Sequence, residues 1–310
     1  MSPIVAAWRD YRDAARAFSR PARAFLGATF LSFAGMGVNQ VLFNLYLTEA
    51  GFHEAFVGRV LTVTGAGVVL AALPAGWLAD RWGRRRTLVL GVVLEGTAFL
   101  TRALVVDPAL LYPLSFTAGI GQSLYAIAAA PFLSEHSTPR ERTHLFSAFF
   151  AIELVAGVAG SLLGGWLPRL FRVLHLAAAG GLFGSYRTTL VVGGAIEAAS
   201  MLPLLVIGRA PEMRLGRERG AARDPQSHLI PKIGFTGFLI GAGAGLVIPF
   251  MNLYFKDRFH CSSAQIGSFF SVAALMTAFA MLIGPVLARR FGRLKTAMAS
   301  QVLSLPFLVT

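Results

Sequence analysis

The sequence predicts an all-α protein whose helices cross a membrane. First, 55% of its 310 residues are hydrophobic and only 14% are charged, whereas a soluble domain usually carries about 25% charged residues. Second, the apolar residues form runs of membrane length, and an open strand cannot satisfy its backbone in lipid. Third, the segment Leu42–Leu47 (LFNLYL) returns as Phe250–Phe255 (FMNLYF) beyond a basic linker. Two related sets of spans are typical of transporters built from structural repeats.

Each run of roughly 20 apolar residues is expected to form one helix, because that length crosses a hydrocarbon core of about 30 Å. The first set holds six spans, near Phe25–Leu47, Phe56–Leu78, Thr87–Val106, Leu110–Leu133, Leu145–Leu167 and Thr188–Ile207. The second set holds spans near Ile233–Phe255 and Ile266–Ala288, and a ninth that begins near Thr296 and stops in mid-helix at Thr310. The apolar segment Val173–Phe183 is too short to cross, so we expect it to be a helix in an outer loop.

The spans divide the chain into four parts. These are a basic tail over residues 1–23, a first six-helix half over 24–208, a basic linker over 209–231 and a partial second half over 232–310. Apolar side chains recur at helical spacing among the arginines of the tail, which indicates an amphipathic helix on the inner membrane surface. A solvated tail is the alternative for this segment.

The positions of the arginines predict the side of the membrane that each loop occupies. With the amino terminus inside, the tail, the loop 81–86, the linker and the segment after residue 288 share one side and hold most of the positive charge. Cytoplasmic loops carry such an excess. Attraction to an anionic inner leaflet then accounts for the net charge of +13 without a nucleic-acid partner. We therefore expect a multi-pass protein of a bacterial-type inner membrane with a cytoplasmic amino terminus.

Several function classes find no support in the sequence. The six histidines are scattered and Cys261 is the only cysteine, so neither a metal site nor an internal disulfide is expected. The sequence has no Gly-x-x-x-x-Gly-Lys-Ser/Thr phosphate cradle, which argues against ATP-driven transport. The paired acid–base groups of a membrane-embedded enzyme are also missing. We expect a protein that is not an enzyme and needs no cofactor.

The loop between the second and third spans carries an ordered motif. It reads Gly-x-x-x-Asp-Arg-x-Gly-Arg-Arg and is formed by Gly76, Asp80, Arg81, Gly83, Arg84 and Arg85. Gly76 lies one turn before Asp80 and would let a neighbouring helix approach closely. The carboxylate of Asp80 can face the positive end of another helix, and Gly83 allows a tight turn. An ordinary positive-inside loop would explain the arginines but not their order.

This motif resembles the signature loop of the major facilitator superfamily of secondary transporters, and the resemblance covers essentially the whole chain. It implies that family's fold, with a complete six-helix first half and about two and a half helices of the second half. About three more helices belong to the family pattern, so we expect a truncated gene product or a partial sequence. In the family this loop is a cytoplasmic latch, in which Asp80 would be the acid. Arg84 would pair with an acid at the end of the fourth span, for which Glu135 is the candidate.

Two further segments extend the resemblance. The second set has a partial latch copy at Gly284, Arg289, Gly292 and Arg293, in which Arg289 replaces the acid. In the fifth span, Gly160-Ser161-Leu162-Leu163-Gly164-Gly165 is similar to the family's antiporter signature Gly-Pro-x-x-Gly-Gly, with Ser161 where proline is expected. Close helix packing by Gly160, Gly164 and Gly165 is the alternative interpretation. In the fourth span, Ser115 stands where the family usually has an arginine linked to proton coupling.

Polar residues inside spans are costly and are candidate sites. Asn39, Gln40 and Asn44 lie in the first span, and Asn252 and Tyr254 hold the corresponding place in the seventh. In the resembled fold both spans line the central cavity, so these residues are the candidates for contact with the solute. Hydrogen bonding between helices is the alternative for Asn44 and Asn252.

Glu95, Glu153 and Glu197 are carboxylates inside spans, and a group of this kind can bind and release a proton during transport. Glu153 is preferred, because the fifth span borders the cavity in the resembled fold. Glu95 and Arg102 lie about two turns apart on one face, and a structural ion pair with neighbouring groups is the alternative role for them.

The sequence thus predicts secondary transport of a small solute by alternating access. Proton-coupled efflux of amphipathic compounds is preferred, because the spans are mostly apolar and the fifth resembles the antiporter signature. Uptake of a nutrient or an organic acid is the first alternative. A receptor or scaffold that has a transporter fold but does not transport is the second.

Overall fold

The computed structural model describes residues 18–139, 141–176, 181–207, 229–292, 295–296 and 298–303. Within these ranges all regular structure is helical. Most of the predicted basic tail and linker, together with Arg293, lies outside the described residues. The first helix already includes Arg20 and the helix after the linker already includes Leu229, so both helices begin inside segments that the sequence analysis assigned to the tail and the linker.

The described helices follow the predicted spans closely. They are α2 (Arg20–Glu49), α3 (Glu54–Trp82), α4 (Arg84–Leu104), α5 (Pro108–Glu135), α6 (Arg142–Val173), α7 (Gly181–Ala199), α8 (Met201–Val206), α9 (Leu229–Val247), the 3₁₀ turn η1 (Ile248–Phe250), α10 (Met251–Phe259) and α11 (Ser263–Phe291). Eight segments of this part are long and apolar enough to cross a membrane, with α7 and α8 forming one and α9 to α10 another. Serine and aspartate caps begin two of the helices, where Ser19 accepts from Ala22 and Asp107 from Ala109.

Two spans that were predicted to be continuous helices are interrupted. The sixth divides between Ala199 and Met201, and the seventh passes through η1 at Ile248–Phe250. A proline lies at each interruption, and a proline has no N–H to donate to the carbonyl four residues earlier. Pro203 therefore leaves the Ala199 carbonyl without its helical donor, and Pro249 does the same to the Gly245 carbonyl.

The predicted outer-loop helix at 173–183 is wrong for the residues that are described. Val173 is the last residue of α6, and Leu182 and Phe183 belong to the first turn of α7. Among the described residues of this segment, Val173, Leu182 and Phe183 extend two spanning helices, and Leu174 and His175 form a turn.

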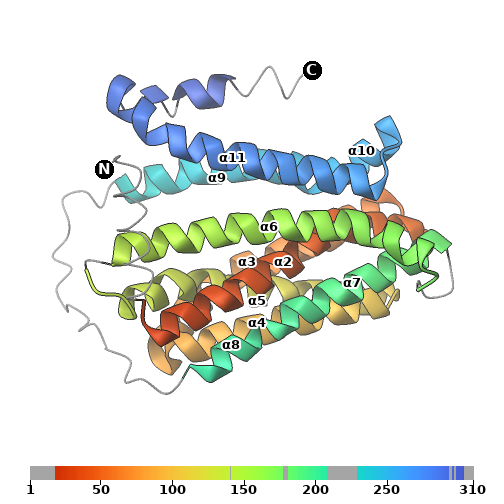
Figure 1. Ribbon diagram of the computed structural model, residues 1–310, viewed down its shortest axis with the longest axis horizontal. Coiled ribbons are helices and arrows are strands. Elements are labelled where there is room, and N and C mark those ends of the chain that lie inside the picture. Colours follow the sequence, from red (N-terminus) through yellow and green to blue (C-terminus); the bar gives the residue numbers. More distant parts are fainter. Residues whose placement is uncertain are drawn as a thin grey trace, which may run out of the picture.

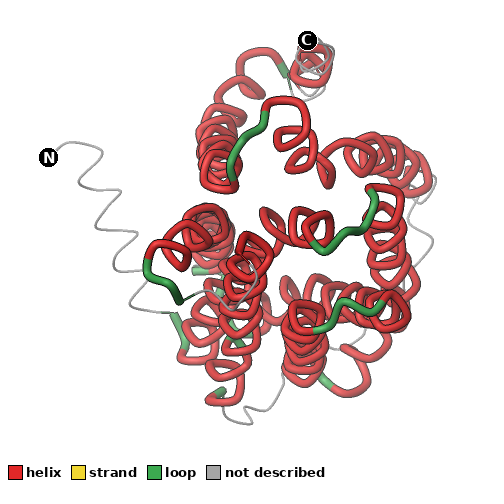
Figure 2. The backbone as a smooth tube through the Cα atoms, turned by 90° about the vertical axis from the view of Figure 1, so that its right-hand side faces the viewer, coloured by secondary structure: helices red, strands yellow, loops and turns green. Residues whose placement is uncertain are grey.

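The helices lie side by side along the long axis of the molecule, with α2 at the centre (Figure 1). α2 packs against α6 and α7, while α5 packs against α3 and α4. On the other side α11 rests on α6, so the second set of helices meets the first mainly through that pair. Figure 2 shows the same bundle nearly end-on, with the helices roughly parallel to one another. Large apolar side chains such as Leu73 (87% exposed) and Leu246 (78%) face outward, as lipid-facing residues do.

Glycines allow α2, α6 and α11 to approach one another closely. A Cβ added at Gly160 would clash with the Ala34 carbonyl oxygen of α2, and one added at Gly164 would lie 3.0 Å from the Val38 Cα. On the neighbouring face of α6, a Cβ at Gly165 would lie 2.8 Å from the Ser263 carbonyl oxygen at the start of α11. The glycines of the fifth-span motif thus place α6 against both sets of helices.

The Gly160→Ala change is expected to destabilise the protein, because backbone atoms of α2 cannot yield to the new methyl group. Overpacking of this kind costs about 1–3 kcal/mol. Gly157→Ala is the matched control, since a Cβ there meets nothing within 4 Å. Removing a helical glycine at an open position is neutral or stabilises by up to about 1 kcal/mol. Thermal unfolding measured in detergent should give a lower Tm for Gly160→Ala than for the unchanged chain, and no decrease for Gly157→Ala. Equal Tm values for the two variants would contradict the close packing of α6 against α2.

Candidate functional site

One end of the bundle is organised around Arg84. The chain turns between α3 and α4 at Gly83, whose φ of 95° favours glycine. Arg84 Nε lies 2.9 Å from Glu135 Oε1 at the end of α5, which is the pair expected from the sequence. Its Nη2 lies 3.4 Å from Asp80 Oδ1. The Glu135 side chain is 6% exposed and that of Asp80 is 74% exposed, so the contact with Glu135 is the one shielded from solvent.

The other motif residues have separate local partners. Arg85 donates from Nε to the Leu204 carbonyl at 3.2 Å and from Nη2 to the Leu205 carbonyl at 3.0 Å, so it satisfies the last carbonyls of α8. The Arg81 guanidinium lies 5.1 Å from the centre of the Trp77 ring. Gly76 faces open space. The expected close approach of a helix at Gly76 is therefore not found within the described part of the chain.

The second-half latch copy shares the turn of the first. Gly292 has φ of 86°, similar to Gly83, and it directly follows the end of α11. Gly284 and Arg289 lie within α11, but the structure does not describe their side chains, and Arg293 lies outside the described residues.

The opposite end of the bundle contains a reciprocal pair of asparagines that we call the asparagine clasp, formed by Asn44 of α2 and Asn252 of α10. Asn44 Nδ2 donates to Asn252 Oδ1 at 3.0 Å and to the Pro249 carbonyl at 2.6 Å. Asn252 Nδ2 donates to the Val41 carbonyl at 3.0 Å and to the Gln40 carbonyl at 3.2 Å. The two residues hold equivalent places in the sequence repeat, so each copy binds the backbone of the other.

The clasp changes the interpretation of the predicted solute contacts. Asn44 and Asn252 are 4% and 1% exposed, and their amides are bound to each other and to backbone. The structure therefore favours hydrogen bonding between helices, which is the alternative interpretation, over contact with a solute. Asn39 is partly buried and Gln40 is exposed, and Tyr254 is 52% exposed with its ring edge-on to Phe259.

An ion pair lies beyond the clasp at the same end. Lys256 Nζ is 2.8 Å from Glu49 Oε1 and donates to Thr48 Oγ1 at 3.2 Å. This pair joins the last turn of α2 to α10. Together with the clasp it ties the two repeats together at the end opposite Arg84.

The interior of the first half contains buried hydroxyl and carboxyl groups. Ser32 of α2 donates to Glu197 Oε1 of α7 at 2.7 Å, and Glu197 is fully buried. One turn earlier, Thr29 Oγ1 is 2.8 Å from the Tyr125 hydroxyl of α5. Glu95, Glu153 and Glu197 all lie within electrostatic range of Tyr125. The three predicted proton-coupling candidates therefore belong to one region of the bundle.

The three carboxylates differ in their surroundings. Glu95 is 5% exposed and lies where α4 meets α5, since a Cβ on Gly121 would be 2.9 Å from the Glu95 Cβ. Glu153 is only partly buried, and no hydrogen bond or ion pair from its side chain occurs among the described residues. Of the three, Glu153 is the one that is both accessible and without such a partner there.

Within the described part of the chain Arg102 has no carboxylate at ion-pair distance, unlike the expectation from the sequence. Its guanidinium lies 4.4 Å from the Phe43 ring centre and 4.6 Å from that of Phe99, and Nη1 donates to Ser115 Oγ at 3.3 Å. Cation–π contacts stabilise a buried cation of this kind. Ser115 is therefore the acceptor for an arginine that comes from α4.

The sequence analysis missed Thr29, Ser32 and Tyr125. Thr29 and Ser32 are spaced by three residues and so share one face of α2. This spacing is visible in the sequence and predicts a polar face on that helix. Tyr125 gave no such signal, because its role depends on how α5 packs against α2.

A bundle of spanning helices whose two related sets meet at an asparagine clasp is typical of membrane transporters built from structural repeats. Among the described residues no group of three or more potential metal ligands occurs. The chain belongs to the Major Facilitator Superfamily, whose family model matches residues 25–310. It is accordingly a multi-pass membrane protein with a secondary-transporter fold and not an enzyme.

Curated relatives match parts of the chain. A Na⁺, Li⁺, K⁺/H⁺ antiporter of Planococcus maritimus is 35% identical over 39% of this chain and 29% of its own length. The multidrug resistance protein MdtH of Enterobacter sp. is 32% identical over 44% of this chain and 34% of its own. The 4-hydroxybenzoate transporter PcaK of Pseudomonas aeruginosa is 32% identical over 57% and 37%. The chain thus spans about a third of the length of these relatives.

Solved structures show the same fold. A bacterial homologue of the human lysosomal transporter Spinster, in an inward-facing and occupied conformation, superimposes with a TM-score of 0.67 at 20% identity. The match covers 87% of this chain and 61% of that one. The nucleoside transporter NupG gives a TM-score of 0.64 at 16% identity, over 88% and 69%.

Arg84→Gln and Glu135→Gln are each expected to destabilise the protein, because each removes one side of a 2.9 Å charged contact that is shielded from solvent. A double-mutant cycle from unfolding midpoints should give a coupling free energy of about 1–3 kcal/mol. Arg86→Gln is the control, since Arg86 is exposed in the same turn. Strictly additive effects would show that the Arg84–Glu135 contact is not formed.

Asn44→Ala is expected to loosen the start of α10, because the Pro249 carbonyl and the Asn252 amide both lose a partner. Loss of about 1.4 kcal/mol of local stability would speed amide hydrogen exchange over residues 250–259 roughly tenfold. Asn39→Ala should leave that exchange unchanged, since Asn39 takes no part in the clasp. Unaltered exchange in Asn44→Ala would mean that the clasp does not hold α10.

Proposed function

We propose that this member of the family exports small amphipathic solutes in exchange for protons, by alternating access. The proposed coupling to protons depends on the surroundings of Glu153. This residue is a carboxylate within a spanning helix that has no hydrogen-bond or ion-pair partner among the described residues. An intramembrane ionisable group is a functional candidate by default.

The position of Glu153 supports a coupling role. It shares a region with Glu95, Glu197 and Tyr125, where Ser32 and Thr29 supply hydroxyl groups. Such a group of neighbours can hold a proton in more than one place. Glu197 is already bound to Ser32 and fully buried, so exchange with water is easier at Glu153.

The apolar surface of α6 supports an amphipathic solute. A hollow of about 740 Å³ runs along the outer half of this helix and is lined by Ala159, Leu162, Leu163, Trp166, Leu167, Arg169, Leu170 and Val173. Two relatives are named for exchange or drug resistance, the cation/proton antiporter and MdtH, which favours efflux. The 4-hydroxybenzoate transporter supports the alternative of organic-acid uptake.

The asparagine clasp supports alternating access. It closes the end of the bundle opposite the Arg84 turn, together with the Lys256–Glu49 pair. We place the Arg84 end in the cytoplasm of a bacterial-type cell, next to an anionic inner leaflet, because the loops at that end carry most of the arginines. The clasped end then faces outward, and opening of that end would release the solute on the outer side of the membrane.

Glu153→Gln is expected to abolish the dependence of transport on a proton gradient. Proteoliposomes with an acidic lumen should accumulate ethidium when they contain the unchanged chain, because protons leave as the cation enters. The Gln variant cannot exchange a proton at this position, so accumulation should no longer vary with pH.

Glu54→Gln is the matched control, since Glu54 is exposed at the first turn of α3. It should retain the pH profile of the unchanged chain. An unaltered profile in Glu153→Gln would rule out its coupling role. Binding of ethidium without any accumulation would favour a receptor over a transporter.

A further inference from the structure

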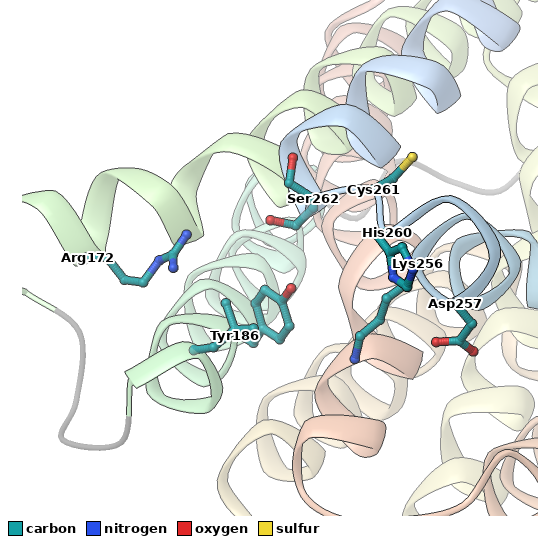
Figure 3. A pocket seen from close by; sticks show the side chains of 9 residues that line it. Arg172, Tyr186, Lys256, Asp257, His260, Cys261 and Ser262 are labelled. Carbon is teal, nitrogen blue, oxygen red and sulfur yellow. The ribbon is translucent and has the colours of Figure 1, made fainter.

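A polar pocket lies at the clasped end of the bundle, away from the three intramembrane carboxylates. Its volume is about 540 Å³, which is within the range of small-molecule sites. Four elements meet around it: the end of α6, the start of α7, the end of α10 and the start of α11 (Figure 3). It is lined by Arg172, Leu182, Tyr186, Lys256, Asp257, His260, Cys261, Ser262 and Ser263.

The two basic side chains of this pocket, Lys256 and Arg172, differ in whether a carboxylate neutralises them. Lys256 is held by Glu49, with 2.8 Å between Nζ and Oε1. Arg172 has no carboxylate partner among the residues that the structure describes. Figure 3 shows the Arg172 guanidinium directed towards Tyr186, whereas the Asp257 carboxylate lies on the far side of Lys256. One positive charge is therefore left over on the side of the pocket that faces α6 and α7.

The floor of the pocket combines an apolar wall with hydroxyl groups. Tyr186 is 4% exposed, and Ser263, which is 8% exposed, donates from its hydroxyl to the Gly165 carbonyl at 3.1 Å. Leu182 lies one turn before Tyr186 on α7 and adds an apolar side chain. Ser263 is also the first residue of α11, so the positive end of that helix adjoins the floor.

We propose that this pocket binds a small solute with one carboxylate group and an aromatic or otherwise apolar body. The Arg172 guanidinium can bind a carboxylate through two parallel hydrogen bonds, and the apolar body lies against Tyr186 and Leu182. A monoanion would pair with Arg172 alone, because Glu49 already neutralises Lys256, and the Asp257 carboxylate on the far side of Lys256 disfavours further negative charge. The site is distinct from Glu153 and its neighbours, and equilibrium binding to it does not depend on transport.

A cysteine beside the pocket can report occupancy. Cys261 is the only cysteine of the chain, so Cys261→Ser followed by Ser262→Cys places one thiol on the rim. The full chain in detergent is treated with a maleimide in the presence of benzoate or of benzamide, which has the same shape but no charge. Benzoate should slow the modification at least about fivefold once the pocket is mostly occupied, and benzamide should not.

Arg172→Gln in the same background should raise the benzoate concentration needed for protection roughly tenfold or more, because a charge-assisted hydrogen bond is lost. Arg169→Gln is the matched control, since Arg169 lies one turn earlier on α6 and lines the apolar hollow instead. Equal protection by benzamide, unchanged protection in Arg172→Gln, or equal loss in both arginine variants would each overturn the proposal. Failure of the Glu153 experiment would leave this result untouched, because no flux is measured here.

Discussion

A polar group carried into an apolar layer is costly without a partner inside the protein, and most of the architecture follows from that constraint, with Glu153 as an exception among the described residues. The central helix α2 meets it with a ladder of contacts to four other helices. Thr29 reaches Tyr125, Ser32 reaches Glu197, Asn44 reaches Asn252, and Tyr46 donates to the Ala103 carbonyl at 3.0 Å. The helix with the most polar contacts is thus also the one that the others surround.

Close approach of the helices makes these contacts possible. Gly160 and Gly164 bring α6 against α2, and Gly35 brings α7 so close that an added Cβ would lie 2.8 Å from the Glu197 Cβ. Packing between small residues replaces the hydrophobic driving force, which is weak between helices surrounded by lipid. The glycine motif that resembles an antiporter signature therefore has a structural role in packing α6 against α2, and this role does not depend on antiport.

The positions of the spans could be predicted because length and apolarity alone define a crossing helix. The Arg84–Glu135 pair could be predicted because the family resemblance implies an acid partner for Arg84 at the end of the fourth span. The interruptions could not be predicted from proline alone. Pro74, Pro113, Pro131 and Pro168 all lie inside continuous helices, whereas Pro203 and Pro249 accompany breaks. Neighbouring packing decides that outcome. Arg172 and Tyr186 were missed as a site for the same reason, since no local pattern shows which helix ends will meet.

The proline at position 249 makes the two copies of the repeat mechanically unequal. Val41 lies at the corresponding place in α2 and has an N–H group to donate, and α2 is one continuous helix there. Its counterpart is interrupted by the 3₁₀ turn at Ile248–Phe250, so α9 and α10 do not share one continuous α-helical ladder. The repeat therefore pairs one unbroken helix with one that is divided three residues before its clasp asparagine.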